Sequence, residues 1–315
     1  MFEHYLLAAA LAATATSATP SPLQDGAVAK TQTIQLDPDG HDRLTVAITI
    51  GGQGPFDFLI DTGAQATVLS RELADRLQLT DRLPALLIGL VSSAQIETVA
   101  VDDLMLGRHN FNVPKAPLVD AEHLGIGIDG ILGLDGLQQR RVLIDFIKRK
   151  IEVADADELG GNRGYEIIVK ARRRLGQLII TDAMVDGVRT AVLVDTGAQA
   201  SVINQALVDR LRTRSHQTTQ LMDVNGTQIE GPLHVLRTFT VDSLSISQIP
   251  AFVVDSPAFK ALGINDKPAM ILGMRELRLF RRVAIDFDTR RILFDIPRSA
   301  QEFNPIIGAK IGRGA

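Results

Sequence analysis

The chain has no cysteine among its 315 residues. A disulfide, a thiol nucleophile and a thiolate metal site are therefore excluded. This absence leaves the compartment open, because a chain without cysteine folds equally well in reducing and oxidising surroundings. Histidine is scarce too, and no two histidines stand at metal-ligand spacing, so we expect no metal site: His4, His41, His109, His123, His216 and His234.

A strong charge of either sign is also missing. The formal net charge is −4, and the short basic run 170–174 is most simply a solvated hairpin. We therefore expect no nucleic-acid partner. With 45% hydrophobic and 22% charged residues, the composition is typical of a soluble globular protein with a large core.

The apolar run from Tyr5 to Ala15 is too short for a bilayer-spanning helix, which takes roughly 20 residues. Its Ala13-Thr14-Ala15 is a candidate cleavage site, and the segment resembles a secretory signal peptide without basic residues at its start. We expect no stable membrane span and a periplasmic or secreted protein. The alternative is an uncleaved arm on a cytoplasmic protein.

What the sequence does contain is one tetrapeptide used twice. Asp61-Thr62-Gly63-Ala64 follows the apolar run 58–60, and Asp195-Thr196-Gly197-Ala198 follows the apolar run 191–194. A single Asp-Thr-Gly is most often a turn in which the carboxylate caps nearby amides. Two copies in matching surroundings instead predict a carboxylate at the end of each of two buried strands.

The surroundings of the tetrapeptides recur as well. Asp61 and Asp195 are 134 residues apart, and four further pairs of segments recur at separations of 133 to 141 residues: 95–97 with 228–230, 101–102 with 241–242, 131–134 with 271–274, and 141–146 with 282–287. One domain-sized unit has been duplicated. We predict two pseudo-symmetric lobes, whose carboxylates can meet at the axis.

The lobes are predicted at 33–155 and 164–297, after a signal peptide and linker at 1–32 and before a loose tail at 298–315. Apolar alternation broken by turns predicts strands throughout both. Short helices are expected at 71–79, capped by Ser70, and at 205–211, capped by Asn204. A hairpin is expected to turn near Ser92-Ser93 and its repeat at Asn225-Gly226, so the fold class is all-β with short helices.

The segment from Gly125 to Gly130 satisfies Gly-x-Gly-x-x-Gly, the pattern of a dinucleotide-binding loop. That loop requires a strand before it and a helix after it in a parallel βαβ unit. Short strands and turns are predicted around this segment instead. We expect no cofactor.

Two carboxylates at one axis cannot both ionise cheaply, so they share a proton. A water between them can lose a proton as it attacks an amide carbonyl, while the protonated partner donates to the carbonyl oxygen. Gly lets the two backbones approach, and Thr can form hydrogen bonds across the axis. The pattern predicts hydrolysis of peptide bonds by Asp61 and Asp195.

Asp-Thr-Gly-Ala followed by an apolar-apolar-Gly element resembles the aspartic peptidases of the retropepsin and pepsin superfamily. Asp129 to Leu134 is similar to the segment that closes the first lobe in the pepsin branch, and the helix expected after each tetrapeptide is more like bacterial retropepsin-like proteins. The resemblance covers residues 33–297. It implies a two-lobed acid-protease fold with the active site in the interlobe cleft, and an aspartic endopeptidase with a peptide or protein substrate.

The resemblance also implies a role for each motif residue. Asp61 and Asp195 are the catalytic pair, and Thr62 and Thr196 interlock the two loops. The remaining loop residues are Gly63, Ala64, Gly197 and Ala198, and 131–133 and 271–273 support the loops from behind.

Two departures from the pepsin branch have consequences. The first hairpin has no tyrosine, since Tyr5 and Tyr165 lie elsewhere, so substrate closure would use backbone contacts from one or both hairpins. Ala64 and Ala198 replace a Ser or Thr, so each aspartate lacks a hydroxyl donor that would favour its ionised form. We expect the pair to titrate higher than in pepsin, with activity at mildly acidic to near-neutral pH.

An extended peptide would bind under the hairpins. The candidate substrate contacts are mainly apolar, which favours cleavage between apolar residues, although ordinary hairpin packing explains them equally well: Leu90, Val91, Ser92, Met222, Val224, Asn225 and Gly226.

Two alternatives to a single-chain peptidase stay open. The first is a peptide-binding or scaffold protein on the same fold that has lost turnover. In the second, each unit pairs with its copy in another chain; the short segment between the units favours pairing within the chain, and hence a monomer. Asp145 and Asp286 also repeat, but they lie in strands beside basic residues and are interpreted as structural.

Overall fold

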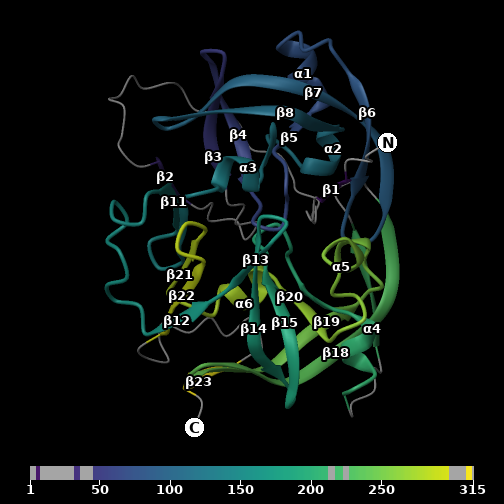
Figure 1. The fold of residues 1–315 in the computed structure, drawn as a ribbon, viewed down its shortest axis with the longest axis vertical. Coiled ribbons are helices and arrows are strands. Elements are labelled where there is room, and N and C mark those ends of the chain that lie inside the picture. The colour runs from purple at the N-terminus through teal and green to yellow at the C-terminus, as the bar shows by residue number, and fades with distance from the viewer. Residues whose placement is uncertain are drawn as a thin grey trace.

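A computed structural model of the chain describes residues 5–7, 32–35, 45–211, 217–222, 227–297 and 310–313. Its strands form three sheets, two of which make one lobe each (Figure 1). The strand order in the N-terminal lobe is β1 (Tyr5–Leu7), β6 (Leu83–Ile88), β7 (Ser93–Leu106), β3 (Thr45–Ile50), β4 (Gln53–Ile60), β9 (Gly130–Leu132), β5 (Val68–Ser70) and β8 (His109–Val119). Strands β7 and β8 also pair, which curls this sheet around its core.

The C-terminal lobe repeats this arrangement. Its strand order is β13 (Arg172–Arg174), β14 (Gln177–Val185), β15 (Val188–Val194), β20 (Ala269–Leu272), β16 (Ser201–Ile203), β19 (Leu244–Val253), β18 (Gln228–Val241) and β17 (Gln217–Met222). The run β4-β9-β5-β8 is parallel, antiparallel and parallel in turn, and so is β15-β20-β16-β19. The shared pairing pattern confirms the duplication predicted from the sequence.

The third sheet joins the lobes. Its order is β12 (Ile167–Lys170), β22 (Arg291–Asp295), β21 (Arg282–Asp286), β10 (Arg141–Asp145), β11 (Lys150–Ala154) and β2 (Gln32–Gln35). Strand β10 of the first unit pairs with β21 of the second, and the fully buried Asp286 accepts hydrogen bonds from Arg141 Nε and Nη2 at 3.2 and 2.6 Å. The two units of one chain therefore pair with each other, and Asp286 is structural as predicted.

The helices are short: α1 (Arg71–Arg76), α2 (Ala121–Leu124), α3 (Leu134–Leu137), α4 (Gln205–Val208), α5 (Pro257–Ala261) and α6 (Met274–Leu277). Ser70 and Asn204 cap α1 and α4, as expected. In the Gly125–Gly130 segment, helix α2 comes before the loop and strand β9 after it. That order is the reverse of a dinucleotide-binding loop.

The end of the chain differs from expectation. Lys310–Arg313 form β23, which pairs antiparallel with β19, so this part of the tail is a strand rather than loose chain. Exposed edge strands offer unpaired amides and carbonyls to any nearby extended segment. The amino-acid composition of the tail does not predict this strand, because the pairing with β19 is made by backbone groups.

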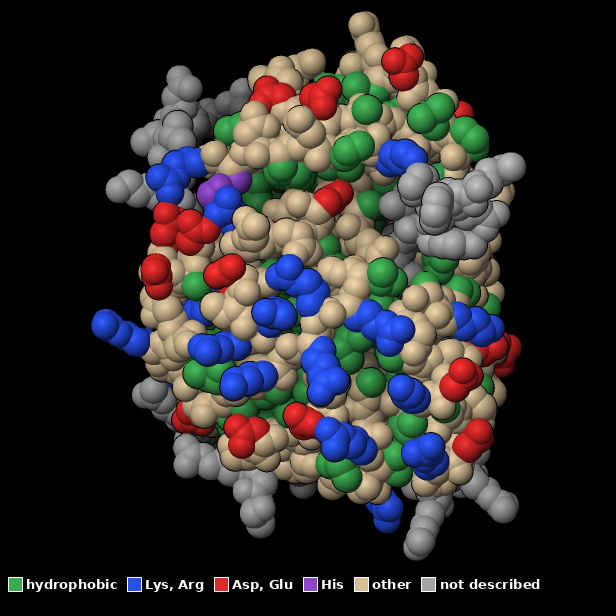
Figure 2. All heavy atoms as spheres, in the orientation of Figure 1, with side chains coloured by type: hydrophobic (Ala, Val, Ile, Leu, Met, Phe, Trp, Pro, Cys, Tyr) green, Lys and Arg blue, Asp and Glu red, His purple; other side chains and the backbone are tan. Residues whose placement is uncertain are grey.

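The surface is uneven in charge. Figure 2 shows Lys and Arg side chains gathered over the lower part of one face. In Figure 1, which has the same orientation, this lower part belongs to the C-terminal lobe. Strand β13, for example, consists of three exposed arginines. In the part of the chain that is described, no helix is both long and apolar enough to cross a membrane.

Candidate active site

The two tetrapeptide loops interlock where the lobes meet. Thr62 Oγ1 donates to the carbonyl of Val194 at 2.9 Å and accepts the amide of Thr196 at 3.1 Å. Thr196 Oγ1 does the same in reverse, with the carbonyl of Ile60 at 2.7 Å and the amide of Thr62 at 3.1 Å. These four reciprocal hydrogen bonds fix the distance between the loops.

Asp61 and Asp195 are held in matching poses. Asp61 Oδ1 accepts the amides of Gly63 and Ala64 at 2.7 and 2.9 Å, and Asp195 Oδ1 accepts those of Gly197 and Ala198 at 2.8 and 3.3 Å. Both side chains are buried, and no described protein donor bonds to either Oδ2. Each carboxylate thus has one oxygen fixed by its own loop and one available for chemistry.

The approach of the loops requires glycine. A Cβ atom on Gly63 would lie 2.4 Å from Asp195 Oδ2, a distance at which no side chain fits. Residue 63 thus lies directly against the carboxylate of the opposite lobe. Asp61 and Asp195, the two aspartates of the repeated tetrapeptide, therefore lie close to each other.

Burial and mutual repulsion disfavour two ionised carboxylates here. Burial is the main cause that raises the pKa of Asp61 well above its usual range, and the charge of Asp195 raises it further. Burial also raises the pKa of Asp195, to about 6, although the neighbouring Asp61 carboxyl and the loop amides lower it. One proton shared between two carboxyls is the state that this geometry favours near neutral pH.

The apolar-apolar-Gly elements lie behind the loops. The amide of Asp61 donates to the Leu132 carbonyl at 3.1 Å, and that of Asp195 to the Leu272 carbonyl at 3.1 Å. Leu134, the first residue of α3, donates its amide to the Ala64 carbonyl at 2.9 Å, and Met274, the first residue of α6, donates its amide to the Ala198 carbonyl at 2.8 Å. Strands β9 and β20 therefore support the loops.

The two hairpins come together at their tips. Ser92 Oγ of the first hairpin lies 3.3 Å from Thr227 Oγ1 of the second. Leu90 is fully buried and Val91 partly so, and both belong to an apolar cluster with residues of the C-terminal lobe such as Phe252. Met222 ends strand β17, whereas Val224, Asn225 and Gly226 lie outside the described residues.

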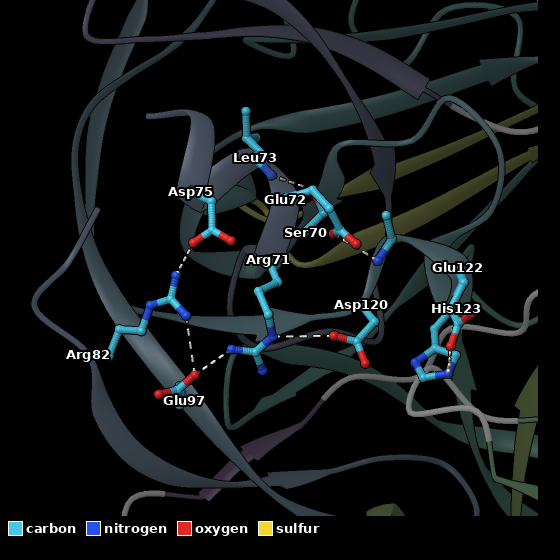
Figure 3. A network of polar contacts seen from close by, with 11 residues as sticks. Ser70, Arg71, Glu72, Leu73, Asp75, Arg82, Glu97, Asp120, Glu122 and His123 are labelled. Carbon is cyan, nitrogen blue, oxygen red and sulfur yellow. Dashed lines mark hydrogen bonds and ion pairs between the residues drawn. The ribbon is translucent and has the colours of Figure 1, made fainter. Parts of the chain in front are cut away.

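The base of the first hairpin is anchored to α1 by charged side chains. Figure 3 shows Glu97 of β7 bonded by both Arg71 and Arg82, and Arg71 also reaches Asp120. Arg82 continues the network to Asp75. Partly exposed pairs like these contribute little individually, but together they orient the hairpin relative to the loop that carries Asp61.

Three sets of residues around the loops escaped sequence reasoning. The buried amide of Gln177 donates to the Gly63 carbonyl, which links the C-terminal lobe to the first loop. Thr67 contacts Asp135 behind the first loop, and Ser201 contacts Glu276 behind the second. Ser201 stands 134 residues after Thr67, the separation of the two tetrapeptides, so a comparison of the two units could have found the hydroxyls. The carboxyls lie one position apart in the repeat, because Asp135 matches Arg275 and Glu276 matches Gly136.

The profile of a family described as "Aspartyl protease" matches residues 46–135 and 181–275, which together make up more than half of the chain. The chain belongs to the aspartyl protease family. Both predicted aspartates fall within the matches, one in each.

A retropepsin-like aspartic protease from Rickettsia conorii, known from its crystal structure, is similar to part of this aspartyl protease. The identity is 22%, the match covers 41% of this chain and 89% of that chain, and the TM-score is 0.30. No curated protein matches the chain. The two-lobed all-β fold with short helices is as predicted.

Among the described residues, no three or more His, Cys, Asp or Glu side chains are grouped so that they could hold a metal ion.

Proposed function

We propose that this aspartyl protease is a single-chain aspartic endopeptidase whose catalytic pair is Asp61 and Asp195. The observation that carries the proposal is the reciprocal Thr62–Thr196 interlock, which holds two buried carboxyls against each other. A water bound between the free Oδ2 atoms would lose a proton to the ionised carboxyl as it attacks the peptide carbonyl. The protonated carboxyl would donate to the carbonyl oxygen.

The substrate would be an extended peptide or protein segment. Strand-like binding under the hairpins uses main-chain hydrogen bonds for affinity and side-chain pockets for preference. The partly buried Val91 near the hairpin tip favours cleavage between apolar residues, whereas Leu90 is fully buried and packs the hairpin against the C-terminal lobe. We also propose a monomer, because the lobes of one chain pair with each other, and an exported protein, because of the signal-like start.

Incubation of the purified chain with a diverse peptide library, with and without pepstatin, tests the proposal. We expect cleavage that pepstatin blocks, with an optimum at mildly acidic to near-neutral pH because burial raises both pKa values. Asp61→Asn and Asp195→Asn should each lower kcat by at least about 10³-fold. An optimum below pH 3 would contradict the expected pH range.

The matched controls are Asp102→Asn and Asp242→Asn, two exposed aspartates that recur in both lobes away from the loops. Both variants should keep the turnover of the unmodified chain. If Asp61→Asn or Asp195→Asn keeps full turnover, the shared pair is wrong. If the unmodified chain cuts nothing at any pH, the result favours the alternative of a peptide-binding or scaffold protein on this fold.

A further inference from the structure

The loop that carries each catalytic aspartate is backed by a hydroxyl and a carboxyl. In the first lobe the amide of Gly133 donates to Thr67 Oγ1 at 3.2 Å, and this hydroxyl donates to Asp135 Oδ1 at 2.5 Å. In the second lobe the amide of Gly273 donates to Ser201 Oγ at 3.2 Å, and this hydroxyl donates to Glu276 Oε2. The same chain of groups thus occurs twice, but with Asp in one lobe and Glu in the other.

The carboxyl in the first lobe is well supported as an anion. Besides the Thr67 hydroxyl, Asp135 accepts the amide of Thr67 at 3.0 and 2.8 Å and that of Gly136 at 2.8 Å. Hydrogen bonds from several donors stabilise an ionised carboxylate. Burial raises the pKa of Asp135, and the hydrogen bonds from Thr67 and Gly136 oppose that rise, so the ionised carboxylate keeps three donors and its contacts behind the first loop.

The carboxyl in the second lobe is much less supported. Glu276 is fully buried, Ser201 is the hydroxyl that bonds its Oε2, and its Oε1 has no partner among the described residues. Burial raises the pKa of Glu276 to about 7, while the Ser201 hydroxyl and the charge of Arg275, its neighbour on α6, lower it less. A buried anion with so few donors is costly, so this carboxyl favours its neutral form.

Glu276 is connected to Asp195 through few contacts. Ser201 follows the loop directly, and a Cβ atom on Gly273 would lie 2.7 Å from the carbonyls of Ala198 and Ala200. The first two amides of α6, the helix that carries Glu276, donate to the carbonyls of Ala198 and Gln199 at 2.8 and 3.1 Å. Movement of α6 or Ser201 would therefore shift the loop that positions Asp195.

We propose that Glu276 is a positioning residue for Asp195, which fixes the second catalytic loop through the hydroxyl of Ser201 and the amide of Gly273. Ionisation of Glu276 places an anion in a buried site where one oxygen has no partner among the described residues, and a shift of α6 that admits water relieves this cost but weakens the contacts to the second loop. The first loop keeps its support from Asp135. The two lobes thus respond differently to pH, and displacement of the Asp195 loop adds to the alkaline decline that loss of the proton shared by Asp61 and Asp195 already causes.

The test measures kcat and KM from pH 5 to pH 9 for the unmodified chain and four variants. Glu276→Gln keeps an acceptor for Ser201 but cannot ionise, so its ratio of kcat at pH 8.5 to kcat at pH 5.5 should exceed that of the unmodified chain at least about fivefold. KM should change less than about twofold, since the positioned group acts in the transition state. Asp135→Asn, the matched change in the first lobe, should lower kcat without removing the alkaline decline.

The hydroxyl gives a second, independent readout. Ser201→Ala should lower kcat about 10- to 100-fold at every pH, because a small misplacement of a catalytic group is costly. Ser201→Thr introduces the residue that stands at the matching place in the first lobe and keeps the hydroxyl. Its kcat should therefore be close to that of the unmodified chain. A Ser201→Ala variant that melts earlier but keeps its kcat would show a structural role alone and overturn the inference.

The inference rests on the proposed function, and the two can fail separately. A chain without turnover overturns both. Turnover that depends on Asp61 and Asp195, while Glu276→Gln keeps the pH profile of the unmodified chain, overturns this inference and leaves the function in place.

Discussion

At the scale of single residues, Thr62 and Thr196 make the two catalytic loops one unit. Each hydroxyl donates to a carbonyl and accepts an amide of the other lobe, and both residues are buried. Loss of a hydroxyl would leave a buried carbonyl and a buried amide without partners. The interlock therefore contributes to folding as well as to the separation of Asp61 and Asp195.

Thr62→Val keeps the shape of this side chain and removes both hydrogen bonds. The two unpaired groups should lower the free energy of unfolding by about 2–4 kcal/mol and lower kcat. Thr62→Ser keeps the hydroxyl and should stay within about 1 kcal/mol of the unmodified chain. Denaturant unfolding and peptide turnover measure both effects, and equal stability of the Val and Ser variants would contradict the interlock.

The catalytic carboxyls also make stability depend on pH. Both pKa values are higher in the folded chain than the ordinary 3.8, that of Asp195 being about 6, so the folded chain binds more protons than the unfolded chain in this window. Stability is therefore largest below about pH 4 for these groups and falls as pH rises through the folded pKa values.

Asp195→Asn removes one of the two titrating groups and the repulsion between them. The decrease in Tm from pH 4.5 to pH 8 should be smaller in this variant than in the unmodified chain, by roughly 2–4 °C for each kcal/mol removed. Calorimetry at the two pH values measures the difference. Asp102→Asn serves as the control, and a decrease equal to that of the unmodified chain in both variants would refute the raised pKa values.

At the scale of elements, the first hairpin is held by apolar packing at its tip and by charged side chains at its base. Leu90 is fully buried in a cluster that reaches into the C-terminal lobe, while Ser92 meets Thr227 at a more exposed position. Apolar burial contributes more than a single exposed hydrogen bond. Closure of the hairpin should therefore depend on Leu90.

Leu90→Ala should lower the free energy of unfolding by about 2–5 kcal/mol. It should also raise KM, because a hairpin that no longer packs across the lobes orders a bound peptide less well. Ser92→Ala is the matched change two residues away, and its effect on stability should be below about 0.5 kcal/mol. Unfolding and steady-state kinetics provide the measurement. A Leu90→Ala variant with unchanged KM would show that the tip does not contact substrate.

At the scale of the whole molecule, the sheet between the lobes joins the first unit to the second. Arg141 and Asp286 are both buried, and Arg141 also donates to the carbonyl of Gly161 and to Asn162 Oδ1. A buried charge that loses its partner is strongly destabilising. The stability of the sheet between the lobes therefore depends on this ion pair, in which Arg141 comes from the first unit and Asp286 from the second.

Arg141→Met should lower the free energy of unfolding by about 3–5 kcal/mol, because Asp286 stays buried without its partner. The neighbouring Arg140 pairs with a largely exposed Asp155, so Arg140→Met should cost at most about 1 kcal/mol. Calorimetry should show one transition in the unmodified chain and a broader or split transition in Arg141→Met. Equal losses in the two variants would contradict the role of the buried pair.

The sequence by itself determined the duplication, the strand-rich class, the capped helices and the two aspartates. Each of these depends on local chemistry or on a repeat, so Asp61 and Asp195 could be found from Asp-Thr-Gly-Ala and its register. Local patterns also placed Ser70 and Asn204 as caps, since a cap acts on the amides that directly follow it.

Tertiary structure alone decided which groups support the pair. Gln177 reaches Gly63 across 114 residues, Ser201 reaches Glu276 across 75, and β23 joins β19 through backbone groups that carry no sequence signal. Such contacts are set by how two curled sheets pack, and no local periodicity encodes a partner so far along the chain. The raised pKa values follow for the same reason, because burial is a property of the packed lobes and not of the tetrapeptide.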